Sequence, residues 1–102
     1  MIKIVIVTKS GCIACSIVKK VITEAINHID SDINFISITN NEFLNESLKV
    51  NIFPTTIFYK ECKSLKELYP SDGYKEIARL VGSFPIDYLN KIIDKLNFEN
   101  NE

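Results

Sequence analysis

A strand-like run near the N-terminus passes directly into a long helical pattern, and this junction constrains the fold more than any other feature. The residues from Ile2 to Val7 are all apolar β-formers except Lys3, a pattern typical of a central strand buried on both faces. From Cys12 to about His28 the apolar residues recur at helical spacing, with polar residues on the opposite side. A second strand over 33–38 completes a right-handed β-α-β unit.

The rest of the chain is predicted to continue with short strands and helices. Thr39 to Asn41 offer capping side chains to the next helix. The segment 60–75 is irregular and contains a strong turn signal at 70–73. The remaining elements are a helix over about 42–49, strands over 55–59 and 76–81, and a helix that begins at Pro85. The order βαβαββα predicts an α/β fold in which helices flank a four-stranded mixed sheet.

Cys12 and Cys15 stand at the strand-to-helix junction, where their spacing suits redox chemistry. Residues three apart at the start of a helix share one face, so the two sulfurs can close a disulfide without large backbone movement. Free N–H groups and the positive end of the helix dipole stabilise a thiolate there. Cys12, nearer the helix end and solvent, is predicted to be the nucleophile, and Cys15 the sulfur that resolves a mixed disulfide.

Composition narrows the class of protein. The 102 residues predict one domain over 1–102, with a frayed polar tail at 97–102. A net charge of -1 gives no indication of a nucleic-acid or anionic-membrane partner. The run from Ile2 to Val7 is too short to span a bilayer and no leader pattern precedes it, so we expect a cytoplasmic protein. There, three cysteines indicate a redox or metal role rather than a disulfide framework.

Three separated motifs make the chain resemble the thioredoxin superfamily. The first is Cys12-Ile13-Ala14-Cys15 after a buried strand, and the second is Ile52-Phe53-Pro54-Thr55, similar to the family's segment with a cis proline. The third is Ala78 to Gly82, which resembles the family's last strand and the glycine that ends it. The resemblance covers nearly the whole chain and implies a minimal thioredoxin fold.

The resemblance also implies a function and a site. Cys12 and Cys15 would be the catalytic, redox-active pair, and Gly11, Phe53, Pro54 and Gly82 would line the substrate groove. The implied activity is reduction of protein disulfides by a monomer that needs no cofactor or metal beyond the Cys12–Cys15 disulfide. A thioredoxin-reductase-like protein or another thiol donor would then restore the dithiol.

Several residues depart from the family pattern. Ile13 and Ala14 replace the Gly-Pro of thioredoxins, Gly11 stands where they place a tryptophan, and Ile6 stands where they hold a buried aspartate. For a glutaredoxin-like enzyme that uses glutathione, the chain lacks both the Pro-Tyr dipeptide and the Gly-Gly-Ser-Asp type segment near Gly82. The direction of electron flow therefore does not follow from the resemblance alone.

Two hypotheses that assign the protein to other functional classes remain open. In one, the two cysteines are ligands of a zinc site, for which Cys62 and His28 are the only further soft ligands in the sequence. In the other, the fold serves as a non-catalytic interaction module that uses the groove and the segment 60–75. Cys62 is either an incidental loop thiol or an additional thiol that takes part in disulfide exchange. Lys9 is either solvated or lowers the pKa of Cys12.

Overall fold

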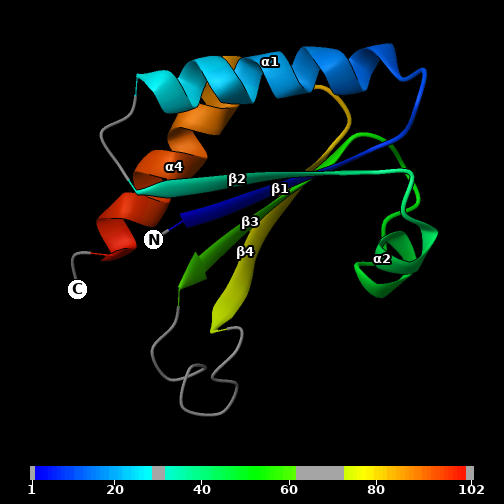
Figure 1. Ribbon diagram of the computed structural model, residues 1–102. Helices are drawn as coiled ribbons and strands as arrows, with labels where there is room; N and C mark the ends of the chain where they lie inside the picture. The colour runs from blue at the N-terminus through cyan, green and yellow to red at the C-terminus, as the bar shows by residue number, and fades with distance from the viewer. Residues whose placement is uncertain (1, 29–31, 62–72, 101–102) are drawn as a thin grey trace.

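The computed structural model describes residues 2–28, 32–61 and 73–100, and these form a sheet with helices on both faces (Figure 1). The elements, in chain order, are β1 (Ile2–Thr8), α1 (Ile13–Asn27), β2 (Ile33–Thr39), α2 (Glu42–Ser47), β3 (Thr55–Glu61), β4 (Tyr74–Val81) and α4 (Ile86–Asn100). This order and the four-stranded mixed sheet confirm the predicted α/β fold.

The central strand β1 is paired on both sides. The sheet order is β2-β1-β3-β4, with β2 parallel to β1, and β3 antiparallel to β1 and to β4. A strand in this position has no solvent-facing side, which explains why every residue of β1 except Lys3 is buried. The antiparallel register places Val7 opposite Thr55, and Thr55 opposite Val81. The end of β1, the start of β3 and the end of β4 therefore meet at one edge of the sheet.

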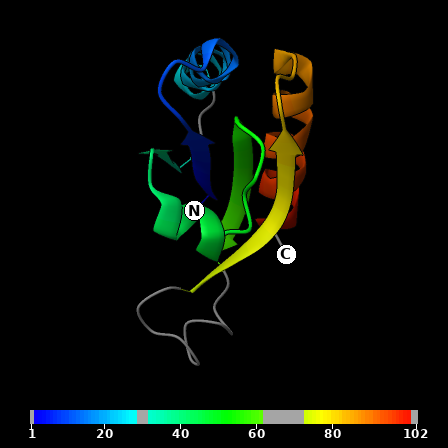
Figure 2. The same cartoon turned by 90° about the vertical axis from the view of Figure 1, so that its right-hand side faces the viewer.

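Each face of the sheet has its own apolar core. Figure 2 shows α1 and α4 on one face and the short α2 on the other. The larger core lies under α1 and α4; its fully buried members are Ile2, Ile4, Ile6, Val18, Ile22, Ala25, Phe58, Leu89, Ile93 and Leu96. The smaller core, on the α2 face, contains Val5, Val7, Val50 and Ile57. Alternate residues of β1 thus contribute to both cores, as the pleat of a strand requires.

Some boundaries differ from those predicted. Strand pairing extends into the irregular segment, because Lys60 pairs with Lys75 and Glu61 with Tyr74. α2 ends early at Ser47, since Lys49 has a left-handed φ of 57° that cannot continue a helix. At the C-terminus, α4 continues to Asn100, past the point where the polar tail was expected to begin. The turn signal at 70–72 and Cys62 lie outside the described residues.

The single arginine of the chain, Arg79, links β4 to the end of α2. Its guanidinium donates to both carboxylate oxygens of Glu76, at 2.8 and 2.6 Å, and through Nη1 to the Leu48 carbonyl oxygen at 3.1 Å. The hydrogen bonds from Arg79, together with its charge, hold the pKa of Glu76 below the ordinary value of 4.5, against a smaller opposing effect of burial. Arg79 thereby fastens the chain segment that leads to Phe53.

The lowered pKa of Glu76 makes a pH-dependent contribution to stability. A carboxyl whose pKa is lower in the folded than in the unfolded protein stabilises the fold above its unfolded pKa, and this stabilisation is lost as the pH falls through the folded pKa. Because the pair is partly exposed, we expect Glu76→Gln to lower the free energy of unfolding at neutral pH by at most about 1 kcal/mol. Urea unfolding at pH 7, and at a series of pH values below 4.5, measures this difference.

The difference between Glu76→Gln and the parent protein should shrink steadily below pH 4.5, where the parent carboxyl becomes protonated. Glu46→Gln, on the exposed side of α2, is the matched control and should show no such trend. A loss in Glu76→Gln that is the same at every pH would show that packing, not charge, is responsible.

Candidate active site

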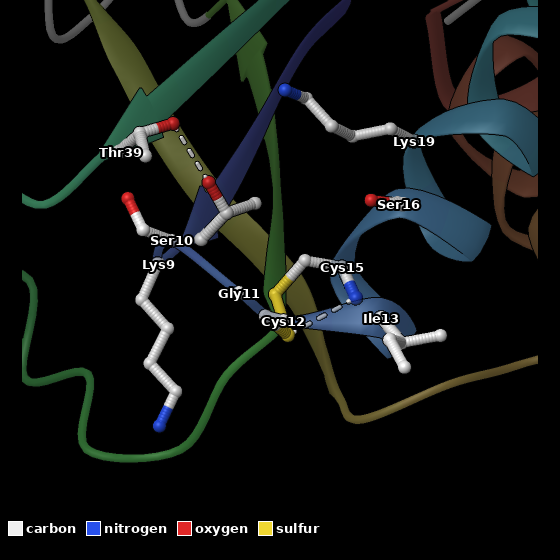
Figure 3. A pocket seen from close by; sticks show the side chains of 10 residues that line it. Lys9, Ser10, Gly11, Cys12, Ile13, Cys15, Ser16, Lys19 and Thr39 are labelled. Atoms are coloured by element: carbon white, nitrogen blue, oxygen red, sulfur yellow. Dashed lines mark hydrogen bonds between the residues drawn. A yellow bond between two sulfur atoms is a disulfide. The ribbon is translucent and has the colours of Figure 1, made fainter.

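Cys12 and Cys15 form a disulfide at the start of α1. Cys12 is the N-cap residue of the helix and Cys15 lies in its first turn, with 5.2 Å between their Cα atoms. The backbone N–H of Cys15 donates to Cys12 Sγ at 3.1 Å (Figure 3). The sulfur thus occupies the place of the oxygen of an ordinary N-cap side chain, and the same N–H would stabilise a thiolate on Cys12 after reduction.

The two sulfurs differ in their access to solvent. Cys15 is buried, with only 3% of its surface exposed, whereas Cys12 is half-buried at the end of the helix. Between them, Ile13 is 79% exposed and projects away from the core. A large disulfide substrate can therefore approach Cys12 more easily than Cys15, which agrees with the roles expected for the two thiols.

The loop before Cys12 is held by the end of β2. Asn40 accepts a hydrogen bond from the backbone N–H of Ser10 at 3.0 Å and donates through Nδ2 to Ser10 Oγ at 2.5 Å. Beside it, the Thr8 and Thr39 hydroxyls are 2.8 Å apart, and the Thr8 hydroxyl donates to the Ile38 carbonyl oxygen at 3.2 Å. The loop over residues 9–11, called the cysteine loop below, is thus attached to the ends of β1 and β2.

Sequence reasoning did not find this role of Asn40. The sequence predicted capping side chains at Thr39 to Asn41. Of these three residues, Asn41 caps α2 by accepting a hydrogen bond from the Leu44 N–H at 3.0 Å. Asn40 instead turns back toward Ser10 from a left-handed backbone, with a φ of 53°. The one local signal was an asparagine directly after a strand, since asparagine adopts the left-handed region more readily than other non-glycine residues.

The two downstream motifs meet beside the cysteine loop. The Phe53–Pro54 peptide bond is cis, the conformation that the resemblance implied, and the Pro54 carbonyl oxygen accepts a hydrogen bond from the Gly82 N–H at 2.7 Å. The Phe53–Pro54 segment precedes β3, whose start pairs with the end of β1, and Gly82 follows β4, whose end pairs with the start of β3. Phe53 is half-buried, and its ring centre lies 5.5 Å from the ammonium group of Lys9.

Gly11 and Gly82 both have left-handed backbones, with φ values of 74° and 82°. No atom lies within 4 Å of the position that a Cβ would occupy on either residue. Their backbone angles, rather than a lack of space, therefore favour glycine at these two positions. The predicted site residues thus all lie at the edge of the sheet where β1 ends and β3 begins.

The one histidine of the sequence lies far from the cysteine pair. His28 caps the far end of α1, roughly 24 Å from Cys12 at 1.5 Å per helical residue. Within residues 2–28, 32–61 and 73–100, no three side chains of the types that bind metal ions are clustered. Cys62 lies outside these ranges.

Among the described residues, no helix is long and apolar enough to cross a membrane.

Ile6 belongs to the larger core and is fully buried. It occupies the place where the family pattern has a buried aspartate, so the corresponding carboxylate is replaced by an apolar side chain. Cys15 therefore has no acidic side chain from this position to accept its proton.

The two hydrogen bonds between Asn40 and Ser10 predict that Asn40 stabilises the fold. Asn40→Ala removes both bonds and places alanine in the left-handed region, so we expect a loss of about 1–3 kcal/mol in the free energy of unfolding. Asn40→Gly removes the bonds but accepts the backbone angle, and should lose less. Urea unfolding of the three proteins tests this order, and equal stability of Asn40→Ala and the parent would contradict it.

No family model and no curated protein sequence matches the chain. Solved structures of thioredoxins, however, superpose on nearly all of it. Thioredoxin-2 of a malaria parasite has 18% identity and a TM-score of 0.75, over 93% of this chain and 82% of that one. Thioredoxin O2 from Arabidopsis thaliana has 21% identity and a TM-score of 0.71, over 94% of this chain and 75% of that one.

A thioredoxin from Fasciola hepatica is similar to the same degree, with 21% identity and a TM-score of 0.70 over 93% of this chain and 80% of that one. These structures have the same arrangement of helices about the sheet, although few of their residues are identical to those of this chain. The comparisons and the strand order together establish that this chain has the thioredoxin fold.

Proposed function

We propose that the protein is a thiol–disulfide oxidoreductase that reduces protein disulfides through the Cys12/Cys15 pair. The observation that carries the proposal is the disulfide between an accessible N-cap cysteine and a buried cysteine one turn later. Its place at the edge of a thioredoxin fold, beside Pro54 and Gly82, supports the same function. Electrons would come from a reductase or a small thiol, and in a reducing cytoplasm the flow would be toward the substrate.

The reaction begins with the reduced pair. The Cys12 thiolate attacks one sulfur of the substrate disulfide, forms a mixed disulfide, and releases the other substrate sulfur as a thiolate that takes up a proton. The Cys15 thiol then loses its proton and attacks Cys12 Sγ, which releases the second substrate thiol and forms the Cys12–Cys15 disulfide. Two electrons and two protons have passed to the substrate.

Removal of the Cys15 proton takes an unusual route in this proposal. With Ile6 at the position of the buried aspartate, no carboxylate at this point of β1 can accept the proton. Water or the substrate thiolate released in the first step is then the acceptor.

The substrate segment would lie over Gly11, Phe53, Pro54 and Gly82. An extended chain can pair with the exposed backbone near Phe53, while the glycine at position 82 keeps that side of the groove low. Ile52 and Val81 flank the same edge and are 59% and 55% exposed. Together with Ile13 they form an apolar rim, which suits a protein substrate better than a small polar one.

The proposed order of attack predicts which variant traps a substrate. In Cys15→Ser the first step remains and the second is lost, so we expect the protein to accumulate as a mixed disulfide with a disulfide-bonded protein substrate. Tested in the Cys62→Ser background, Cys12→Ser should form no such adduct, because its one remaining thiol, Cys15, is buried. Non-reducing electrophoresis and intact mass measure both results.

Cys62→Ser is the matched control, because it removes a third thiol and leaves the pair intact. It should retain catalysed reduction of the protein substrate by dithiothreitol. The proposal is wrong if the parent protein shows no such catalysis, or if Cys15→Ser traps nothing. Zinc that is bound to protein purified without added metal, and is lost in Cys12→Ser, would favour the hypothesis of a zinc site instead.

A further inference from the structure

A hollow of about 370 Å³ lies beside the disulfide, between the end of β1, the end of β2 and the first turns of α1 (Figure 3). Both cysteines line it, so a molecule bound there is next to the reacting sulfurs. The remaining lining residues are Thr8, Lys9, Ser10, Gly11, Ile13, Ser16, Lys19 and Thr39. The proposed groove residues Phe53, Pro54 and Gly82 do not line it.

The charge of the hollow has one sign. Two lysines line it and none of the lining residues is acidic. In Figure 3 the side chain of Lys19 extends from α1 toward the strands, while Lys9 points the opposite way, toward the Phe53 ring. Lys19 is half-buried and follows Cys15 by four residues, so helical geometry places both on the same face of α1.

Hydroxyl groups complete the polar surface. Ser16 lies one turn before Lys19 on α1, and its hydroxyl faces the same space in Figure 3 as the Thr39 hydroxyl. The Thr8 hydroxyl donates to the Ile38 carbonyl oxygen, so in the 2.8 Å contact between the Thr8 and Thr39 hydroxyls the donated proton is that of Thr39. The Ser16 side chain is exposed, so its hydroxyl can donate to a ligand. An ammonium group beside a hydroxyl donor is suited to a carboxylate, since charge-assisted hydrogen bonds are stronger than neutral ones.

We propose that this hollow binds a carboxylate carried by the substrate a few bonds from its disulfide, with Lys19 as the cation and Ser16 as the hydroxyl donor. The proposal rests on the function proposed above and adds a substrate class to it: disulfides flanked by acid. The carboxylate can belong to a small acidic disulfide or to an acidic side chain next to a cysteine in a peptide.

The reaction is that already described, with one ionic contact added. While the carboxylate is held at Lys19, the Cys12 thiolate forms a bond to one substrate sulfur, and the bond between the two substrate sulfurs breaks. Attack by Cys15 then releases the remaining half as a thiol. The protein dithiol supplies both electrons, so no other reductant takes part.

Single-turnover kinetics with the reduced protein test the proposal. The probes are dithiodipropionate and its uncharged diamide, which share the disulfide and differ only in charge, and quenched samples are analysed by intact mass. We expect the dicarboxylate to react about tenfold faster than the diamide, as one charge-assisted hydrogen bond predicts. The ratio of the two rates should fall toward one in Lys19→Gln, remain high in Lys19→Arg, and decrease in high salt.

Lys20→Gln is the control, because Lys20 is exposed on the same helix and does not line the hollow. Its ratio should equal that of the parent. A second pair of probes, peptide disulfides with Asp or Asn beside the cysteine, separates the two sources of the carboxylate. A preference for the acid only in the small pair assigns the hollow to small disulfides, and a preference in both pairs extends it to peptides.

The results that overturn the proposal differ from those that overturn the function. If both small disulfides react at equal rates, or if Lys19→Gln slows both by the same factor, the function stands and the carboxylate site does not exist. If neither small disulfide reacts, the peptide pair decides: equal rates for the Asp and Asn peptides overturn the carboxylate site, and no reaction with any of the four probes overturns the proposed function. In that case NMR titration of the oxidised protein with propionate still decides the site: shifts of the Ser16 and Lys19 amide signals support it, and their absence overturns it.

Discussion

The pairing of β1 on both of its sides is the constraint on which the rest of the structure depends. β1 is hydrogen-bonded to β2 and β3, and helices cover both faces of the sheet, so its alternate residues supply the two cores. The pairing of β1 with β3 sets Val7 opposite Thr55, and the pairing of β3 with β4 sets Thr55 opposite Val81. That row of residues sets the position of every segment that contributes to the site, because each of them adjoins a strand end.

Local hydrogen bonds then hold the site at this edge. Asn40 attaches the cysteine loop to β2, and the Gly82 N–H attaches the end of β4 to Pro54. Arg79 ties β4 to the carbonyl of Leu48, at the base of the segment that carries Phe53. Bonds between residues distant in sequence therefore hold the segments around the disulfide in place.

The features that depart from the thioredoxin pattern concern chemistry rather than architecture. Ile6 keeps the core continuous where a buried carboxylate would have to be desolvated, which favours stability but leaves Cys15 without that proton acceptor. Beside the disulfide, the hollow is lined by Lys9 and Lys19 and by no acidic residue. The apolar side chain at position 6 thus changes the surroundings of Cys15 without changing the fold that this chain shares with the solved thioredoxins.

The sequence by itself determined the order of elements, the burial of β1 and the placement of Cys12 and Cys15 on one helix face, because periodicity and local spacing encode these directly. Element ends were less certain: pairing between Glu61 and Tyr74 lengthened the hairpin, and the left-handed Lys49 shortened α2. Only the tertiary structure decided that Asn40 holds Ser10, that Arg79 reaches Leu48, and that Lys19 faces a hollow beside the disulfide. These contacts join residues that belong to different helices, strands and loops. A periodic pattern along the sequence shows which face of an element is apolar, but it does not show which residues of two elements meet.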